Sequence, residues 1–146
     1  ARQTADAEYV SLHVRKGDFL NPEVRRVHAL VEPVYFYNAI RFCQAKLVNP
    51  IFCVYSDDPG WVRKNLRLDA QHVMMPKSYH AFVDMWSMAQ LDHHIISNST
   101  FSWWAAWLSQ ARNEGIGIKI SPKNWYVDTQ KDAVNSEELL DGFIKL

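Results

Sequence analysis

Short apolar runs alternate along this chain with longer segments in which apolar residues recur at helical spacing. The short runs, typical of strands, are residues 8–14, 50–56, 71–76, 93–97 and 116–122. Helical spacing is found in residues 32–47, 58–66, 78–92, 98–112 and 136–146. Strands that look apolar on both faces and alternate with helices favour a parallel sheet with helices on each side. The pattern predicts one three-layer α/β domain over residues 1–146.

Residues near the starts of the helical segments indicate where helices begin. Pro33 suits the first helical position, and Ser78 and Ser136 are suited to cap the helices that follow them. One of Asp57 and Asp58 is placed to cap the next helix.

Three tryptophans, Trp103, Trp104 and Trp107, stand within residues 98–112. Their spacing of three and four residues places at least two of them on one helical face. We expect the three rings to pack this helix against the sheet.

Composition and charge exclude several classes of protein. The chain has 146 residues, formal net charge +0, 48% hydrophobic and 22% charged residues, which is ordinary for a soluble domain. A neutral chain has no field that would favour nucleic acid, so we expect no nucleic-acid partner. No apolar run is long enough to cross a bilayer, and the polar start ARQTADAE lacks the layout of a signal peptide.

Cys43 and Cys53, in a predicted helix and strand, are expected to be buried thiols, which favours a reducing compartment.

Polar clusters follow three of the predicted strands. They are residues 13–18, residues 56–58 and residues 97–100. Ligands of an open parallel sheet bind beyond the carboxyl ends of its strands. If the three strands are neighbours, the three clusters form one site.

The residue types in these clusters suit a phosphorylated or nucleotide ligand. Ser99 and Thr100 precede a predicted helix, whose first N–H groups and dipole favour an anion. Arg15 supplies the planar, forked cation that phosphates favour. The chain has no Walker loop and no GxGxxG fingerprint, which disfavours a P-loop NTPase and a dinucleotide dehydrogenase.

Two other pairs of residues have side chains that bind metals. Asp57 and Asp58 would have to converge on one ion. His93 and His94 are adjacent on a predicted strand and point to opposite faces of the sheet.

The motifs HVRKGDF, VYSDDPGWVRKNL, DMWSMAQLDHHIISNSTFSWWAAWL and ISPKNW resemble, in this order, the motif series of family 11 glycosyltransferases, the α-1,2-fucosyltransferases. The resemblance runs from His13 to Trp125. It implies the Rossmann-like, donor-binding C-terminal half of a GT-B-type enzyme. Such an enzyme transfers L-fucose from GDP-β-L-fucose to the 2-hydroxyl of a galactoside, with inversion and without a metal or other cofactor. The expected partners are GDP-fucose, a galactose-containing glycan and the N-terminal half of the same enzyme.

The resemblance and the strand-end rule together assign a donor site. Its members are His13, Arg15, Lys16, Gly17, Asp18, Ser56, Asp58, Asp84, Asn98, Ser99, Thr100 and Ser102. Arg15 is expected to stabilise the charge that develops on the departing GDP, Gly17 to permit a tight turn, and Asp18 to position the loop.

Alternatives stay open at several of these positions. His13 either contacts the ligand or orders the Arg15 loop, and Lys16 is either a second phosphate contact or a solvated cation. Asp84 either faces the guanine or is a solvated carboxylate on its helix. The catalytic base is Glu23, His28, a group of the other half or the leaving diphosphate itself.

The chain departs from the family pattern at three positions. Lys16 stands in place of a second arginine, Phe19 in place of tyrosine, and Ala105 where glycine is common. These departures bear on the strength of donor binding. Two other functions also stay open: a non-catalytic domain that binds a nucleotide sugar, and a plain α/β interaction domain. The expected location is the cytoplasm or the bacterial inner-membrane surface, or the Golgi lumen if the source is eukaryotic.

Overall fold

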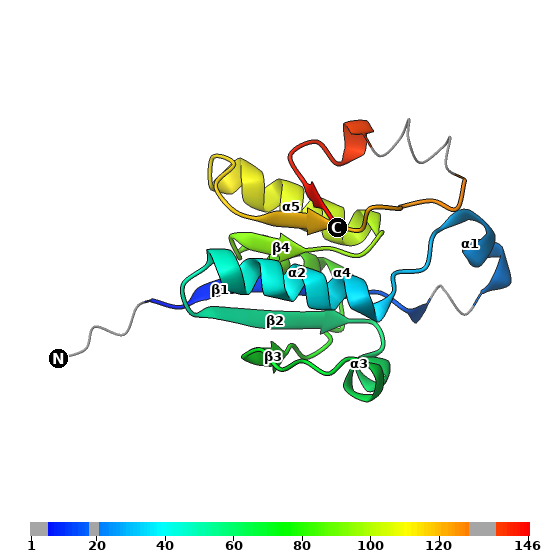
Figure 1. The fold of residues 1–146 in the computed structure, drawn as a ribbon, viewed down its shortest axis with the longest axis horizontal. Helices are drawn as coiled ribbons and strands as arrows, with labels where there is room; N and C mark the ends of the chain where they lie inside the picture. Colours follow the sequence, from blue (N-terminus) through cyan, green and yellow to red (C-terminus); the bar gives the residue numbers. More distant parts are fainter. Residues whose placement is uncertain (1–5, 18–20, 129–136) are drawn as a thin grey trace.

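The computed structural model describes residues 6–17, 21–128 and 137–146. The strands of the described residues form one sheet in which every pairing is parallel. They are β1 (Glu8–Val14), β2 (Pro50–Ser56), β3 (His72–Met74), β4 (His93–Ile95), β5 (Lys119–Ser121) and β6 (Ile144–Lys145). The order is β3-β2-β1-β4-β5-β6, which is the order of the Rossmann fold. Figure 1 shows β1 within the sheet, between β2 and β4, and the predicted α/β architecture is confirmed.

Helices cover both faces of this sheet. On one face, α2 (Pro33–Lys46) and α3 (Pro59–Asn65) bury apolar side chains against Val10, Leu12 and Val14 of β1. On the other face, α4 (Ala81–Ala89) and α5 (Thr100–Arg112) pack against β2 and the end of β4. Because β1 is covered on both sides, its residues from Val10 to Val14 are all buried, as the apolar pattern predicted.

A short helix, α1 (Pro22–Val27), lies beyond the carboxyl ends of the strands (Figure 1). The sequence analysis missed it, although its start carries a clear signal. Pro22 occupies the first helical turn, and the Asn21 side chain accepts a hydrogen bond from the Glu23 N–H at 2.9 Å.

Two of the predicted helix starts agree with the structure and a third does not. Pro33 begins α2, and Asp58 caps α3 by accepting from the Trp61 N–H at 2.8 Å. However, α4 begins after His80 rather than at Ser78. Ser78 instead donates its backbone N–H to the Asp84 carboxylate, at 3.1 and 3.3 Å from the two oxygens.

The prediction of a terminal helix over residues 136–146 is wrong. Of residues 137–146, the part of this segment that the structure describes, only 137–139 are helical, and residues 144–145 form β6 beside β5. Gly142 has a positive φ of 76° between the two segments, a conformation that ends a helix. Pairing with the edge of β5 overrides the helical spacing, and Ser136 lies outside the described residues.

Only one of the three α5 tryptophans packs as expected. Trp103 joins the cluster around Trp125 and donates its indole N–H to the Leu139 carbonyl at 2.6 Å. Trp104 and Trp107 are each 47% exposed and contact each other edge to face. The small residues Ser102, Ala105, Ala106 and Ser109 occupy the buried face of α5, which keeps the helix close to the sheet.

Cys43 and Cys53 are buried free thiols, as predicted. Burial raises the pKa of the Cys43 thiol to about 12. Across the described ranges, no helix is long and apolar enough to cross a membrane.

Candidate functional site

The three polar clusters that follow β1, β2 and β4 meet at one edge of the sheet. β1 pairs with β2 on one side and with β4 on the other, so the carboxyl ends of all three strands are adjacent. The three strands are therefore neighbours, as the predicted site requires, but none of residues 56–58 lines the pocket described below. Each neighbouring cluster holds the segment after β1 by different hydrogen bonds.

The β2 end braces the segment after β1 with a carboxylate. Asp57 accepts the backbone N–H groups of Lys16 at 2.8 Å and Gly17 at 2.6 Å. Ser56 donates its hydroxyl to the Val14 carbonyl at 2.7 Å and accepts the Asp58 N–H at 3.0 Å. Ser56, Asp57 and Asp58 therefore all bond to backbone groups.

Gly17 leaves room for the Asp57 carboxylate. Its φ is not positive, unlike those of Gly115, Gly117 and Gly142. A Cβ atom at Gly17 would instead lie 2.6 Å from Asp57 Oδ2. The missing side chain lets the carboxylate approach the backbone.

The β4 end holds the segment after β1 through Ser97. The Ser97 hydroxyl donates to the His13 carbonyl at 2.7 Å and accepts the Arg15 N–H at 3.2 Å. The following residues continue into α5 and form one side of a pocket.

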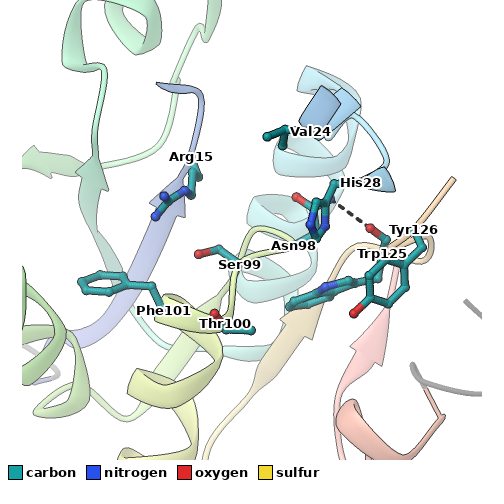
Figure 2. Close-up of a pocket in the computed structure, with 9 residues that line it drawn as sticks. All are labelled: Arg15, Val24, His28, Asn98, Ser99, Thr100, Phe101, Trp125 and Tyr126. Atoms are coloured by element: carbon teal, nitrogen blue, oxygen red, sulfur yellow. Dashed lines mark hydrogen bonds between the residues drawn. The ribbon is translucent and has the colours of Figure 1, made fainter. Parts of the chain in front are cut away.

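The pocket has a volume of about 260 Å³ and lies where the strand order reverses, between β1 and β4 (Figure 2). Ligands of doubly wound α/β folds bind at this position. Its walls come from the segment after β1, from α1 and its C-cap, from the β4–α5 connection with the start of α5, and from the segment after β5. The lining residues are Arg15, Val24, His28, Asn98, Ser99, Thr100, Phe101, Trp125 and Tyr126.

One side of the pocket is suited to an anion. Arg15 lines it, and in Figure 2 this side chain lies on the side of Ser99 and Phe101, away from His28 and Tyr126. The first intrahelical bond at this end of α5 runs from the Trp103 N–H to the Ser99 carbonyl, and the Ser99 side chain makes no capping hydrogen bond. The N–H groups of the first turn and the helix dipole therefore face this side with partial positive charge.

The opposite side of the pocket is lined by aromatic rings. The rings of His28 and Tyr126 lie 5.5 Å apart, and residues 28 and 126 also form a backbone bridge. Asn98 donates its side-chain amide to the Ala29 carbonyl at 2.6 Å and to the Trp125 carbonyl at 3.2 Å.

His13 lies beneath this edge rather than in the pocket lining. Its ring packs 5.6 Å from that of Phe101, and burial first, then Arg15, lowers its pKa from 6.5 to about 4. The side chain is therefore neutral at pH 7. The ring contacts Phe101 of α5, and Nδ1 has no hydrogen-bond partner among the described residues, so these contacts do not decide between the two predicted roles.

Lys16 is directed away from the pocket lining. Its ammonium group lies 4.0 Å from the centre of the Trp61 ring, a cation–π geometry. Burial lowers the pKa of Lys16, and the Arg25 charge lowers it further, whereas Glu32 and Asp57 raise it.

Several predicted site residues lie outside the pocket lining. Ser102 is buried and donates to the Ser99 carbonyl at 3.2 Å, Glu23 is exposed on α1, and Asp84 binds the Ser78 backbone. Asp18 and Phe19 lie outside the described residues. Ala105 lies on the buried face of α5, in the cluster with Cys53 and Tyr55 of β2.

Four lining residues escaped the sequence analysis: Val24, Phe101, Trp125 and Tyr126. Phe101 and Trp125 fall in the quoted motifs. A signal for the last two was available, because they follow the end of β5, a fourth strand that points to the same edge of the sheet.

The described side chains do not gather into a metal centre. Within residues 6–17, 21–128 and 137–146, no three His, Cys, Asp or Glu side chains are grouped to hold an ion. Asp57 and Asp58 bond to different backbone groups. His94 contacts the Ser11 hydroxyl at 2.8 Å, whereas His93 accepts the Ile118 N–H at 3.0 Å.

The parallel sheet, its strand order and the pocket at the switch point define a Rossmann-like α/β domain. Comparison with known proteins narrows the class. The chain belongs to glycosyl transferase family 11, whose family model matches residues 3–141. The resemblance drawn from the motifs is thereby confirmed.

Relatives from bacteria and from animals match the chain. An alpha-1,2-colitosyltransferase of Escherichia coli is 36% identical over 87% of the chain and 43% of its own length. The O-antigen biosynthesis glycosyltransferase WbnK of Escherichia coli is 30% identical over 97% of the chain and 45% of its own length. Galactoside alpha-(1,2)-fucosyltransferase 1 of Saimiri sciureus is 30% identical over 69% of the chain and 29% of its own length. The chain thus spans less than half the length of these relatives, and no solved structure gives a significant match.

Proposed function

We propose that this chain is the donor-binding half of a GT-B-type galactoside 2-α-L-fucosyltransferase. The reaction transfers L-fucose from GDP-β-L-fucose to a galactose 2-hydroxyl, and the change from β to α is an inversion at the anomeric carbon. The pocket at the β1–β4 switch point, with Arg15 and the start of α5 on one side, carries the proposal. Membership of family 11 supports the class of reaction.

Arg15 and the start of α5 suit the diphosphate of the donor. As the bond from fucose to GDP breaks, negative charge develops on the diphosphate. A guanidinium group and a helix N-terminus fixed beside it stabilise that charge without rearrangement. Ser99 and Thr100 line the same side and add two hydroxyl donors.

The proton of the acceptor hydroxyl needs a destination. Of the two bases predicted on this chain, His28 lines the pocket, whereas Glu23 is exposed on α1 outside it. We therefore assign His28 as the candidate base of this half. The acceptor glycan and an N-terminal half complete the proposed enzyme.

The reaction as proposed requires no metal ion, because Arg15 and α5 supply the positive charge at the leaving group. Activity of the complete enzyme is expected to be unchanged in EDTA. Strict dependence on Mg²⁺ or Mn²⁺ would contradict this part of the proposal and restore Asp57 and Asp58 as candidate ligands.

Calorimetric titration of the chain with GDP and GDP-fucose tests the site. Loss of one charge-assisted contact in Arg15→Ala is expected to weaken binding by roughly 1.5–3 kcal/mol, about one to two decades. Arg63→Ala on exposed α3 removes the same charge away from the pocket and is the matched control. Equal affinity of Arg15→Ala and the wild type would remove Arg15 from its role.

A second donor is favoured by one observation. The relative with 36% identity is an alpha-1,2-colitosyltransferase. Colitose differs from fucose by the absence of the hydroxyl at C3, so the same pocket is suited to either sugar. Tighter binding of GDP-colitose than of GDP-fucose would favour this alternative.

Two further functions make different predictions. A binding module without catalysis would bind GDP-fucose yet stay inactive in the full-length protein, and a plain interaction domain would bind no nucleotide sugar at millimolar concentration.

We place the protein in the cytoplasm or at the bacterial inner-membrane surface, or in the Golgi lumen if the source is eukaryotic. Fractionation of the source cells tests that placement.

A further inference from the structure

The Asn98 side chain has a fixed orientation in the wall of the pocket. It is 5% exposed, and its amide nitrogen donates to the Ala29 carbonyl at 2.6 Å and to the Trp125 carbonyl at 3.2 Å. The second of these bonds is drawn in Figure 2. Two carbonyl partners identify that end of the amide as the nitrogen, because an oxygen there would face two acceptors.

The other end of the amide is a buried acceptor. Asn98 Oδ1 is buried and has no hydrogen-bond partner among the residues that the structure describes. Buried polar atoms without a partner are rare in folded proteins. Because Asn98 also lines the pocket, a ligand there is a suitable source of the missing partner.

The chemistry of this atom excludes a phosphate as that partner. A carbonyl oxygen accepts hydrogen bonds, and so do the oxygens of a diphosphate. Both N–H groups of the Asn98 amide already bond to backbone carbonyls. Asn98 is therefore suited to a ligand O–H or N–H group and not to the anion that the sequence analysis assigned to this loop.

The two sides of the pocket indicate which part of a nucleotide sugar lies near Asn98. Arg15 and the start of α5 mark the side that suits an anion, whereas the bonds of Asn98 to Ala29 and Trp125 place it towards the aromatic side (Figure 2). A volume of about 260 Å³ is below the roughly 300–1,000 Å³ typical of sites for whole ligands, so the pocket holds only part of the donor. Two groups adjoin the diphosphate of the donor, the transferred sugar and the ribose of guanosine. The candidate base His28 lines the same side as Asn98, and the base acts at the transferred sugar, so we place that sugar beside Asn98.

We propose that Asn98 determines donor specificity by accepting a hydrogen bond from one hydroxyl group of the transferred sugar. This proposal rests on the proposed function, namely that the pocket holds a nucleotide sugar. It assigns Asn98 to the sugar, whereas Arg15 binds the diphosphate. A donor that lacks the recognised hydroxyl leaves Oδ1 buried without a partner.

Binding of deoxy donors to the wild-type chain gives the first test. GDP-fucose and its 2-deoxy, 3-deoxy and 4-deoxy analogues are titrated calorimetrically, with GDP alone as the reference without a sugar. One analogue is expected to bind roughly 5- to 100-fold more weakly than GDP-fucose, the effect of leaving a buried acceptor without its donor. Equal binding of all three analogues and GDP-fucose would overturn the proposal and would point to a structural water at Oδ1.

Asn98→Ala gives the second test. It forms a double-mutant cycle in which one change is the substitution in the protein and the other is the hydroxyl removed from the ligand. In Asn98→Ala the penalty for the sensitive analogue is expected to fall to within about twofold, while GDP binds as it does to the wild type. Asn65→Ala is the matched control, because Asn65 also donates its amide to a carbonyl, that of Trp61 at 2.9 Å, and is exposed on α3. A penalty that persists in Asn98→Ala would overturn the proposal, and so would a loss of GDP affinity, which would indicate the guanine as the group that Asn98 recognises.

The outcomes separate this inference from the proposed function. If the wild type binds neither GDP nor GDP-fucose, the proposed function fails first. If Arg15→Ala weakens GDP binding but no deoxy analogue is discriminated, only the role of Asn98 fails. Thermal unfolding of Asn98→Ala checks its fold, and the wild-type analogue series decides the question if that variant does not fold.

Discussion

The ends of β2 and β4 flank β1 and carry similar polar residues, yet the two ends have different roles. At β2, Ser56, Asp57 and Asp58 all bond to backbone groups of the protein. At β4, Ser97 braces the segment after β1, but the three residues that follow it line the pocket. The comparison shows that one strand end serves as a structural brace and the other as a wall of the site.

A drop in pH from 7 to 5 is expected to have the largest effect, because two buried imidazoles, His13 near the end of β1 and His94 within β4, are neutral in the folded protein. His13 and His94 have pKa values lowered by burial from 6.5 to about 4. Between these values the unfolded chain binds more protons than the folded one, so stability falls as the pH falls. The loss at pH 5 is about 2 kcal/mol for each imidazole, or about 4 kcal/mol for the two.

Denaturant unfolding at a series of pH values measures this loss. His13→Asn is expected to remove about half of the decrease between pH 6.5 and 5, whatever its stability at pH 7. An unchanged pH dependence in that variant would show that His13 is not protonated on unfolding.

Asp57→Ala tests the brace at β2. It removes the acceptor for the Lys16 and Gly17 N–H groups and is expected to cost about 1–3 kcal/mol in the free energy of unfolding. GDP affinity is expected to fall as well, because Arg15 belongs to the braced segment. Asp57→Asn retains one acceptor oxygen and should lose less in both measurements; an equal loss would argue that charge, not hydrogen bonding, holds the segment.

Asp58→Ala tests whether the capping of α3 by Asp58 is independent of the bonds that Asp57 makes to the segment after β1. Loss of the hydrogen bond to the Trp61 N–H is expected to cost about 0.5–2 kcal/mol of stability. GDP affinity should not change, because Asp58 lies outside the pocket lining. A marked drop in affinity would return Asp58 to the donor site that the sequence analysis assigned.

Gly17→Ala is expected to have the smallest effect. Its Cβ atom would displace Asp57 Oδ2, the mobile end of a side chain, and break one hydrogen bond at a cost of about 0.5–1.5 kcal/mol. In an Asp57→Ala background the same substitution should cost almost nothing, because the displaced atom is absent. Equal costs in the two backgrounds would show that Gly17 is needed for its backbone conformation.

Much of the fold could be predicted because its signals are local. The apolar run of β1 is long and buried, and Pro59 with Asp58 marks the start of α3. The errors fall where tertiary contacts override a local pattern. Residues 144–145 extend the sheet beside β5 despite their helical spacing, and Trp104 and Trp107 face outwards because small residues fill the buried face of α5.

Only some of the residues predicted for the candidate site line the pocket. Arg15, Ser99 and Thr100 line the pocket as the motifs indicated. Ser102 does not, because its hydroxyl turns back to the Ser99 carbonyl inside the helix. A motif identifies which loop approaches a ligand, but a hydrogen bond within that loop decides which side chains remain available to it.

The sequence by itself determined the alternation of strands and helices, the three polar strand ends and the family motifs, because periodicity and short-range spacing are properties of the chain. Only the tertiary structure decided what each polar group binds. Asp57 and Asn98 both follow buried strands, yet the carboxylate bonds to backbone N–H groups and the amide oxygen does not bond to the described protein. That difference depends on which backbone groups from distant parts of the chain lie within 3 Å, and no local pattern encodes it.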